Sequence, residues 1–246
     1  MHKTTSGIVI KERPIGEKDK VITVLTRNLG VVEAIARGVR NTKSKLLSGV
    51  SLFTYSDFEF YEGKNYTYIN SAEEKNSFHS ISDDIEKMSL CFYFSELVIT
   101  MNPGEEESND FLRLFLNSLY LLSNNERDKA LVKAVFELKT AEYCGMMPDI
   151  TACENCGVYE GAEFYLDAKR GHLLCSECKT IGCYKLTSKS LMALRFVFLN
   201  KIDKAFNFTL DEASLELLSI ASEGYILNQT QYRFKTLDFY SSLIKG

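Results

Sequence analysis

The chain has 246 residues, 45% of them hydrophobic, which is enough for one large domain or for two to three small ones with adequate cores. No stretch approaches the ~18 apolar residues of a membrane span, and no apolar signal segment precedes the first polar residues, so we expect a cytoplasmic protein without a membrane partner. The net charge of −4 conceals an asymmetry, because the first 50 residues carry ten Lys and Arg against four Asp and Glu, whereas the remaining 196 carry nineteen against twenty-nine. A basic N-terminal block on an acidic body indicates either a polyanion-binding end or a merely solvated basic surface.

The N-terminal third has the alternation of β-strands. Turn signals at 14–16, 28–30 and 62–64 separate the apolar runs. The strands are expected at 4–12, 20–27, 30–37, 53–61 and 65–71. Five short strands in about 75 residues suit a small closed barrel such as an OB-fold, which binds nucleic acid across one face, and an SH3-like barrel would give a similar pattern.

A cationic segment lies between the third and fourth expected strands. It places Arg37, Arg40, Lys43 and Lys45 within nine residues, separated mainly by small polar residues. Such a segment is predicted to be a flexible loop that binds a phosphate backbone without reading its sequence. Further cations flank the first turn and could extend this track: Lys11, Arg13, Lys18 and Lys20. Nearby tyrosines either stack on bases or pack the barrel: Tyr55, Tyr61, Tyr66 and Tyr68.

From residue 77 onward apolar residues recur about every 3.6 residues instead of every second one, which indicates helices. Asp83 or Asp84 can cap a helix that continues through Thr100. A later helix is expected to begin at Thr187 or Ser188 and to continue through Leu199, and the other expected helices are 106–123, 126–144 and 210–228. The amphipathic tail at 233–244 either docks onto the helical core or binds a partner.

Four cysteines carry the strongest chemical signal. Cys153, Cys156, Cys175 and Cys178 form two CxxC pairs separated by a loop of suitable length for one tetrahedral metal site. Four soft thiolates favour zinc and leave no position open for water, so the site is predicted to be structural. Short strands at 163–167 and 171–174 between the pairs would complete a zinc ribbon.

Other assignments of the cysteines remain open. The four could form two disulfides or stay reduced thiols, although seven cysteines and a reducing compartment fit free thiols better. Cys183 or His172 could replace one ligand of the regular set. Cys91 and Cys144, which lie among apolar neighbours on expected helices, are interpreted as small core residues.

The N-terminal motifs resemble those of a known family. The segment from Gly7 to Lys20 contains an Arg-Pro-x-Gly-Glu-x-Asp turn, and Ala36-Arg-Gly-Val-Arg40 and Lys43-Ser-Lys-Leu46 follow it farther along the chain. Together they are similar to the N-terminal signature of bacterial RecO recombination mediators. The order of the remaining segments, with a CxxC…CxxC ribbon inserted between helices, extends the resemblance over essentially the whole chain.

The resemblance implies an α+β protein, with an OB-fold at 1–78, a helical domain at 79–246 and a zinc-ribbon module at 149–184 within it. It also implies that the protein binds single- and double-stranded DNA and anneals complementary strands that are coated by single-stranded DNA-binding protein. The protein would contact the C-terminal tail of that coating protein and would assist RecA loading together with RecR. The eight cations above become the DNA-binding candidates. The tail-binding surface falls in the helical domain but on no identifiable residues.

No catalytic pattern is present. The sequence lacks GxxxxGK[ST], GxGxxG and HExxH, and its three histidines form no recognisable catalytic arrangement. Glu105, Glu106 and Glu107 could suggest a metal-dependent nuclease, but a negative charge bias at a helix N-terminus explains them better. The alternative to a non-enzymatic mediator is a zinc-ribbon nucleic-acid enzyme or RNA-binding factor.

Overall fold

The computed structural model describes residues 2–244, which divide into two compact units. The first unit contains the described residues up to Ser123 together with those from Lys235 onward, and the second is Asn124–Phe234. Strands and helices are largely segregated along the chain, so the predicted α+β class is confirmed. None of the helices in the described range is long and apolar enough to cross a membrane.

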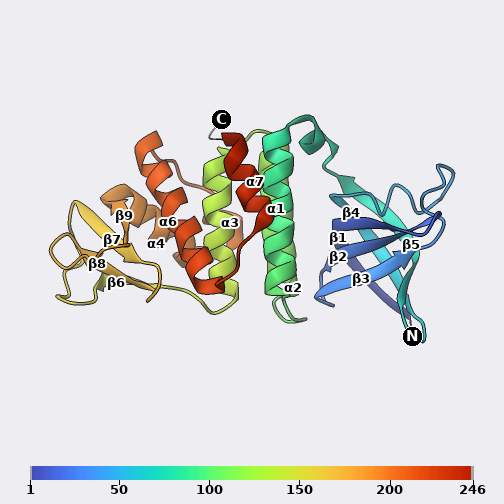
Figure 1. Ribbon diagram of the computed structural model, residues 1–246, viewed down its shortest axis with the longest axis horizontal. Helices are drawn as coiled ribbons and strands as arrows, with labels where there is room; N and C mark the ends of the chain where they lie inside the picture. Colours follow the sequence, from blue (N-terminus) through green and yellow to red (C-terminus); the bar gives the residue numbers. More distant parts are fainter. Residues whose placement is uncertain (1, 245–246) are drawn as a thin grey trace. The chain divides into compact units, whose positions relative to one another are not determined.

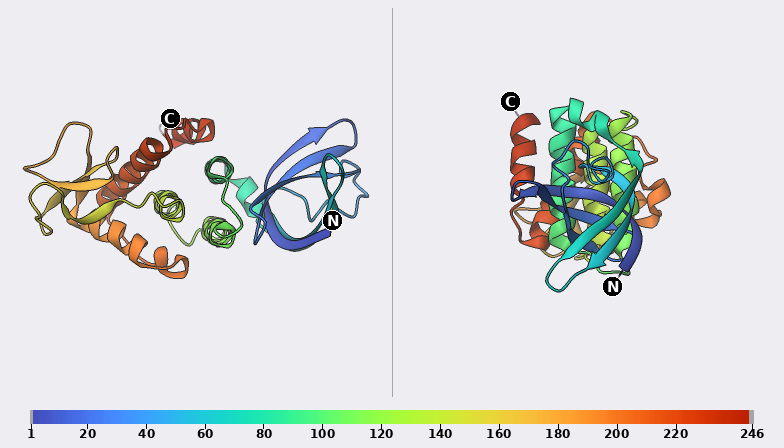
Figure 2. Two further views of the ribbon diagram at one scale, coloured as in Figure 1. Left: turned by 90° about the horizontal axis from the view of Figure 1, so that it is seen from below. Right: turned by 90° about the vertical axis from the view of Figure 1, so that its right-hand side faces the viewer.

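The N-terminal strands close into the predicted OB-like barrel (Figure 1). The strands are β1 His2–Ile15, β2 Asp19–Thr26, β3 Val31–Ala36, β4 Thr54–Glu62 and β5 Thr67–Ser77. They pair in the order β1-β2-β3-β5-β4, and β4 pairs in turn with β1. All these pairs are antiparallel except that of β3 with β5, which is parallel and places Ile35 opposite Tyr68. The curvature of the closed sheet is visible in Figure 2.

Two strands are longer than the sequence pattern indicates. β1 continues to Ile15 and β5 to Ser77, although their apolar alternation ends several residues earlier. The extensions are still paired, with Arg13 opposite Val21 and Glu73 opposite Asp57. The side chains of these extensions are mostly exposed. The strands therefore continue by backbone hydrogen bonding beyond the residues whose burial produces the apolar alternation.

The barrel core consists of inward side chains from several strands and from the segment between β3 and β4. Phe58 and Phe60 are almost fully buried, and their rings stack with centroids 5.5 Å apart. The segment 37–53 adds Val39 and Val50, which are 0% and 1% exposed. It therefore covers part of the barrel core as well as linking two strands.

Helices complete the first unit. The 3-10 turn η1 His79–Asp83 leads into α1 Ile85–Met101, followed by α2 Ser108–Ser123. Asp84 caps α1 as predicted, since its side chain accepts from the N–H groups of Glu86 and Lys87. The C-terminal segment forms α7 Lys235–Ile244, which packs against α1, in keeping with the docking interpretation of the tail.

The second unit combines a small sheet with helices. Its strands are β6 Asp149–Cys153, β7 Glu163–Asp167, β8 His172–Cys175 and β9 Tyr184–Thr187, in the order β6-β8-β7-β9. Its helices are α3 Lys129–Tyr143, α4 Ser188–Leu199, α5 Ile202–Ala205 and α6 Glu212–Thr230. The predicted ribbon strands correspond to β7 and β8, each of which contains a run of three buried residues. The sequence pattern does not predict β6 or β9, which lack such a run, or α5, which is a single turn.

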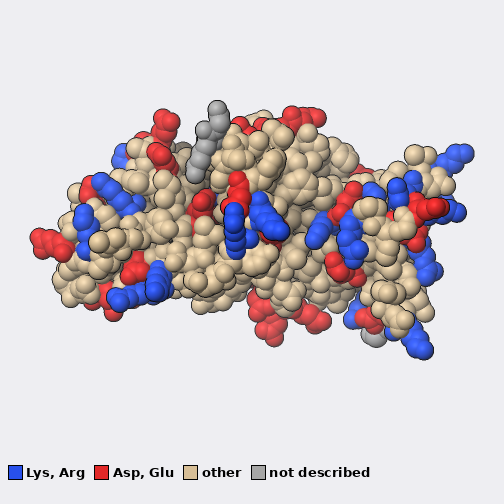
Figure 3. Space-filling model, in the orientation of Figure 1, with Lys and Arg blue, Asp and Glu red and all other residues tan. Residues whose placement is uncertain are grey.

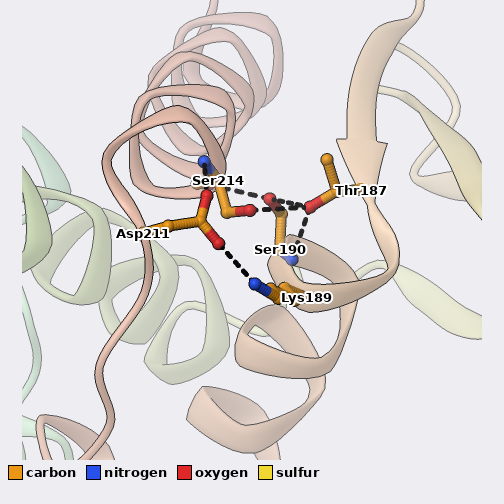
Figure 4. A network of polar contacts seen from close by, with 5 residues as sticks. All are labelled: Thr187, Lys189, Ser190, Asp211 and Ser214. Carbon is orange, nitrogen blue, oxygen red and sulfur yellow. Dashed lines mark hydrogen bonds and ion pairs between the residues drawn. The ribbon is translucent and has the colours of Figure 1, made fainter.

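Polar contacts join the starts of α4 and α6 (Figure 4). Thr187 caps α4 by accepting from the N–H of Ser190 at 3.1 Å, and Asp211 caps α6 by accepting from the N–H of Ser214 at 3.0 Å. The hydroxyl of Ser190 donates to the carbonyl of Ser214 at 2.7 Å, and Lys189 Nζ donates to Asp211 at 2.8 Å. The two helix starts are thereby fixed to each other.

A buried ion network connects α3 to α6. Lys133, 3% exposed, places its Nζ 2.9 Å from Glu137 and 2.7 Å from Glu223. The hydroxyl of Ser222 donates to the other oxygen of Glu137 at 2.6 Å. Removing one partner of such a network leaves an uncompensated buried charge, which costs about 3–5 kcal/mol.

Gly49 provides a test of how the segment 37–53 packs on the barrel. A Cβ at this position would lie 2.4 Å from the carbonyl oxygen of Ala72 on β5, a backbone atom that cannot rotate away. We therefore expect Gly49→Ala to lower the free energy of unfolding by about 1–3 kcal/mol, measured by urea denaturation. The neighbouring exposed residue supplies a control, since Ser48→Ala should change stability by less than about 0.5 kcal/mol. Equal stability of the two variants would contradict the packing.

Candidate metal centre and nucleic-acid interface

The small sheet of the second unit positions the four cysteines. Cys153 and Cys175 are the last residues of β6 and β8, which are parallel neighbours, so both strands end at the same edge of the sheet. Beyond each strand the chain turns back, with the N–H of Gly157 donating to the carbonyl of Cys153 at 2.8 Å and that of Cys178 to the carbonyl of Cys175 at 3.2 Å. These turns return Cys156 and Cys178 toward the first two sulfurs.

The sulfur geometry fits one tetrahedral ion. All four Sγ atoms lie within 4.8 Å of one another, and those of Cys156 and Cys175 are 3.7 Å apart. Zinc–sulfur bonds of about 2.3 Å in a tetrahedron require sulfurs about 3.8 Å apart, whereas a disulfide requires about 2.05 Å. The four cysteines can therefore hold a metal ion in the arrangement that their spacing predicts.

The electrostatics of the cluster favour a bound cation. Burial acts to raise the pKa of Cys153, but backbone N–H groups of the two CxxC turns outweigh it and lower this pKa to about 6. A hydrogen bond with Cys175, aided by burial, instead raises the pKa of Cys178 to about 12. A divalent cation would compensate the charge of all four thiolates and allow them to ionise together.

The remaining cysteines and His172 lie outside this cluster. Cys183 contacts the hydroxyl of Thr180 at 3.3 Å, and His172 Nε2 is 3.9 Å from the carboxylate of Asp167. Neither joins the four sulfurs, so the regular ligand set is the one that the geometry supports. Cys91 is fully buried as predicted, and its burial raises its pKa.

The interpretation of Cys144 as a core residue is wrong. This side chain is exposed because Cys144 is the C-cap residue of α3, where the chain leaves the buried face of the helix.

On the barrel, the start of the segment 37–53 is fixed by specific contacts. The guanidinium of Arg37 lies 4.1 Å from the ring centroid of Tyr68, and Arg40 donates from Nη1 to the carbonyl of Gly16 at 2.9 Å. The N–H of Arg40 also donates to the carbonyl of Lys18 at 3.0 Å. The predicted flexible loop is thus tied to the β1–β2 turn, and its buried valines anchor it further along.

These contacts bring several of the predicted cations together. Lys18 lies in the β1–β2 turn beside Arg40, and Lys20 pairs in register with Ala36, next to Arg37. The other candidates lie farther along the same elements: Lys11 and Arg13 on β1, and Lys43 and Lys45 on the segment 37–53. Figure 3 shows Lys and Arg side chains over the barrel, interspersed with acidic ones.

The charges of these cations are mostly uncompensated. Lys20 forms an ion pair with Glu12 at 3.0 Å, which weakens it as a phosphate ligand. The other seven candidates form no ion pair within the range 2–244, and all seven are exposed. An exposed cation without a carboxylate partner keeps its donors available for phosphate oxygens.

A groove on the barrel is bordered by β1, β2, β3 and the β4–β5 hairpin. Its volume is about 300 Å³, at the lower end of the range of small-ligand sites. It is lined by Arg13, Ile15, Val21, Glu33, Ala34, Ile35, Asn65, Tyr66 and Thr67. Of these residues, Arg13 and Tyr66 were predicted from the sequence as candidate DNA contacts. The groove itself was not predicted, because β3 and the hairpin come together only when the barrel closes.

The acidic run before α2 does not converge on a site. Glu105, Glu106 and Glu107 immediately precede this helix, in keeping with a charge bias at its N-terminus. Among residues 2–244, the four cysteines are the one group of three or more potential metal ligands that come together. The geometry therefore gives no support to a carboxylate nuclease site.

Comparison with known proteins agrees with this architecture. The family model for the recombination protein O N-terminal region matches residues 1–78, and that for the C-terminal region matches residues 82–238. The DNA repair protein RecO of Acetivibrio thermocellus is 32% identical over 97% of this chain and 96% of its own length. Those of Alkaliphilus metalliredigens and Clostridium novyi are 33% and 26% identical over 74% and 97% of this chain, and 74% and 93% of their own lengths. The chain therefore belongs to the RecO family of DNA repair and recombination proteins.

Proposed function

We propose that this chain is a non-catalytic recombination mediator that binds single- and double-stranded DNA through its barrel. It anneals complementary strands coated by single-stranded DNA-binding protein, contacts the C-terminal tail of that protein, and assists RecA loading together with RecR. Membership of the RecO family supports the role in repair and recombination. In this division of labour, residues 1–78 bind DNA and residues 79–246, with the metal module at 149–184, serve the protein partners.

The observation that carries the proposal is the grouping of unpaired cations around the β1–β2 turn. Arg40 is held there by two hydrogen bonds, to the carbonyls of Gly16 and Lys18, and Arg37 is oriented by the ring of Tyr68. A cation that is already positioned loses little side-chain entropy when it binds a phosphate. Lys43 and Lys45 extend the positive charge along the exposed part of the segment.

Annealing by such a surface requires no reacting side chain. Two DNA strands repel each other through their phosphates, and cations that neutralise both strands lower the barrier to their encounter. Base pairing then supplies the driving force, provided that the protein leaves the bases accessible. The cations therefore accelerate the encounter without taking part in a chemical step.

Zinc is the ion that we propose for the four cysteines. The set of four thiolates is closed and leaves no position for a substrate or water, so the ion supplies folding free energy, on the order of 10 kcal/mol for sites of this type near neutral pH. In the second unit, Cys153 and Cys175 would fix the ends of β6 and β8, and Cys156 and Cys178 would close the two turns.

The DNA-binding proposal predicts a change in salt dependence. Replacing Arg37, Arg40, Lys43 and Lys45 together by Gln should weaken single-strand binding and reduce the slope of log K against log salt by about 0.7 for each phosphate that the variant no longer neutralises. Fluorescence anisotropy of a labelled oligonucleotide over a salt series measures both quantities.

A matched variant separates local contacts from net charge. Lys169, Arg170, Lys201 and Lys204 are exposed cations of the second unit, and their replacement by Gln removes the same total charge. This variant should retain most of the slope. A slope that is unchanged in the barrel variant, or reduced equally in both, would remove the segment 37–53 from the DNA-binding site.

The metal proposal predicts a loss of stability that is separate from DNA binding. Cys153→Ser should abolish binding of about one equivalent of zinc and lower the melting temperature, while DNA affinity of the folded protein changes by less than about two-fold, because the ligands support the ribbon. Elemental analysis, thermal unfolding and anisotropy give the three readouts. Cys144→Ser is the control, since that exposed cysteine lies outside the cluster. Loss of DNA affinity at full stability would indicate instead that the ribbon contacts DNA.

A further inference from the structure

The structure distinguishes one tyrosine from the other three on the barrel hairpin. Tyr68 is covered by the guanidinium of Arg37, the ring of Tyr61 contacts that of His2 with centroids 5.2 Å apart, and Tyr55 has the Nζ of Lys75 at 5.9 Å from its ring centroid. Tyr66 is 61% exposed. Within residues 2–244 its ring has no aromatic or cationic partner, so its face is available to a ligand.

Tyr66 lines the barrel groove together with apolar side chains. Ile15, 40% exposed, and the half-buried Ile35 also line it. Exposed apolar surface of this kind is stabilised when a planar, uncharged group covers it. A volume of about 300 Å³ gives room for such a group.

The polar residues of the groove favour a base over a phosphate. Glu33 is exposed on β3 and places a negative charge among the lining residues, which repels a phosphate. Its carboxylate accepts hydrogen bonds, and the side chain of Asn65 both accepts and donates, so the two match the amino and carbonyl groups of base edges. Arg13 and the nearby cations remain available to the phosphates that flank such a base.

We propose that this groove holds one unpaired base of single-stranded DNA against the ring of Tyr66. The inference rests on the proposed DNA-binding function and adds to it a residue that distinguishes single strands from duplex. The cations bind phosphates of either form, whereas in a duplex the base is already paired and stacked and must be flipped out to reach the groove. Pairing of two strands thus removes the Tyr66 contact, which promotes release of the annealed product.

The test compares two DNA forms and three substitutions. Anisotropy is measured with a single-stranded oligonucleotide and with a blunt duplex, made of two strands, that has the same total number of nucleotides. Tyr66→Ala should weaken single-strand binding roughly five- to 150-fold, the equivalent of ~1–3 kcal/mol of base stacking, and leave duplex binding nearly unchanged. Tyr66→Phe should restore single-strand affinity because it keeps the aromatic face. Tyr61→Ala, which removes a tyrosine of the same hairpin that does not line the groove, should have little effect.

A stacking readout separates a direct contact from a structural effect. An oligonucleotide that carries 2-aminopurine should lose fluorescence on binding to the native protein and to Tyr66→Phe, and should lose less on binding to Tyr66→Ala. Equal weakening of single-strand and duplex binding by Tyr66→Ala, or no weakening of either, would overturn the inference while leaving the proposed function intact. Absence of binding of either DNA form by the native protein would instead overturn the proposed function.

Discussion

The parallel pairing of β3 with β5 is the contact on which the groove and the position of Arg37 in the proposed DNA-binding surface depend. It closes the barrel and places Ile35 opposite Tyr68, which are more than 30 residues apart in sequence. Because of this register, Arg37 can lie over the Tyr68 ring, and the hairpin that carries Tyr66 faces β3 across a groove. Closure also pairs strand edges that would otherwise be open to other chains. The groove and the position of Arg37 are thus consequences of one sheet topology, whereas Arg40 is held by the β1–β2 turn.

The second unit is held together by contacts of a different kind. Its small sheet has strands of only four or five residues. The proposed metal ion would join two cysteines at the ends of β6 and β8 to two in the turns that follow, and would add to the stability of the sheet. The caps at Thr187 and Asp211 fix the starts of α4 and α6. The buried network at Lys133 fixes α3 to α6 at a cost in desolvation.

Local patterns made much of this structure predictable from the sequence. Alternation located the barrel strands, and the CxxC spacing identified the four cysteines that cluster, because both features depend on neighbouring residues. The alternation did not predict the ends of β1 and β5, because these residues are paired by backbone hydrogen bonds while their side chains are exposed. The interpretation of Cys144 as a core residue also failed, because its apolar neighbours do not reveal that its side chain is exposed at the end of the expected helix. The anchoring of Arg40 arises because the chain after β3 returns beside the β1–β2 turn. The distinction between Tyr66 and Tyr68 arises from the contact of Arg37 with Tyr68, which forms on barrel closure.

Annealing under the conditions of repair tests the central claim most directly. Complementary DNA strands would each be coated with the cognate single-stranded DNA-binding protein, mixed with the metal-loaded chain, and followed by energy transfer between labels across a salt series. Our account predicts acceleration that declines as salt rises, because phosphate neutralisation drives the encounter of the strands. If the folded, metal-loaded protein binds DNA and yet gives no acceleration at any salt concentration, the account of this chain as an annealing mediator is contradicted.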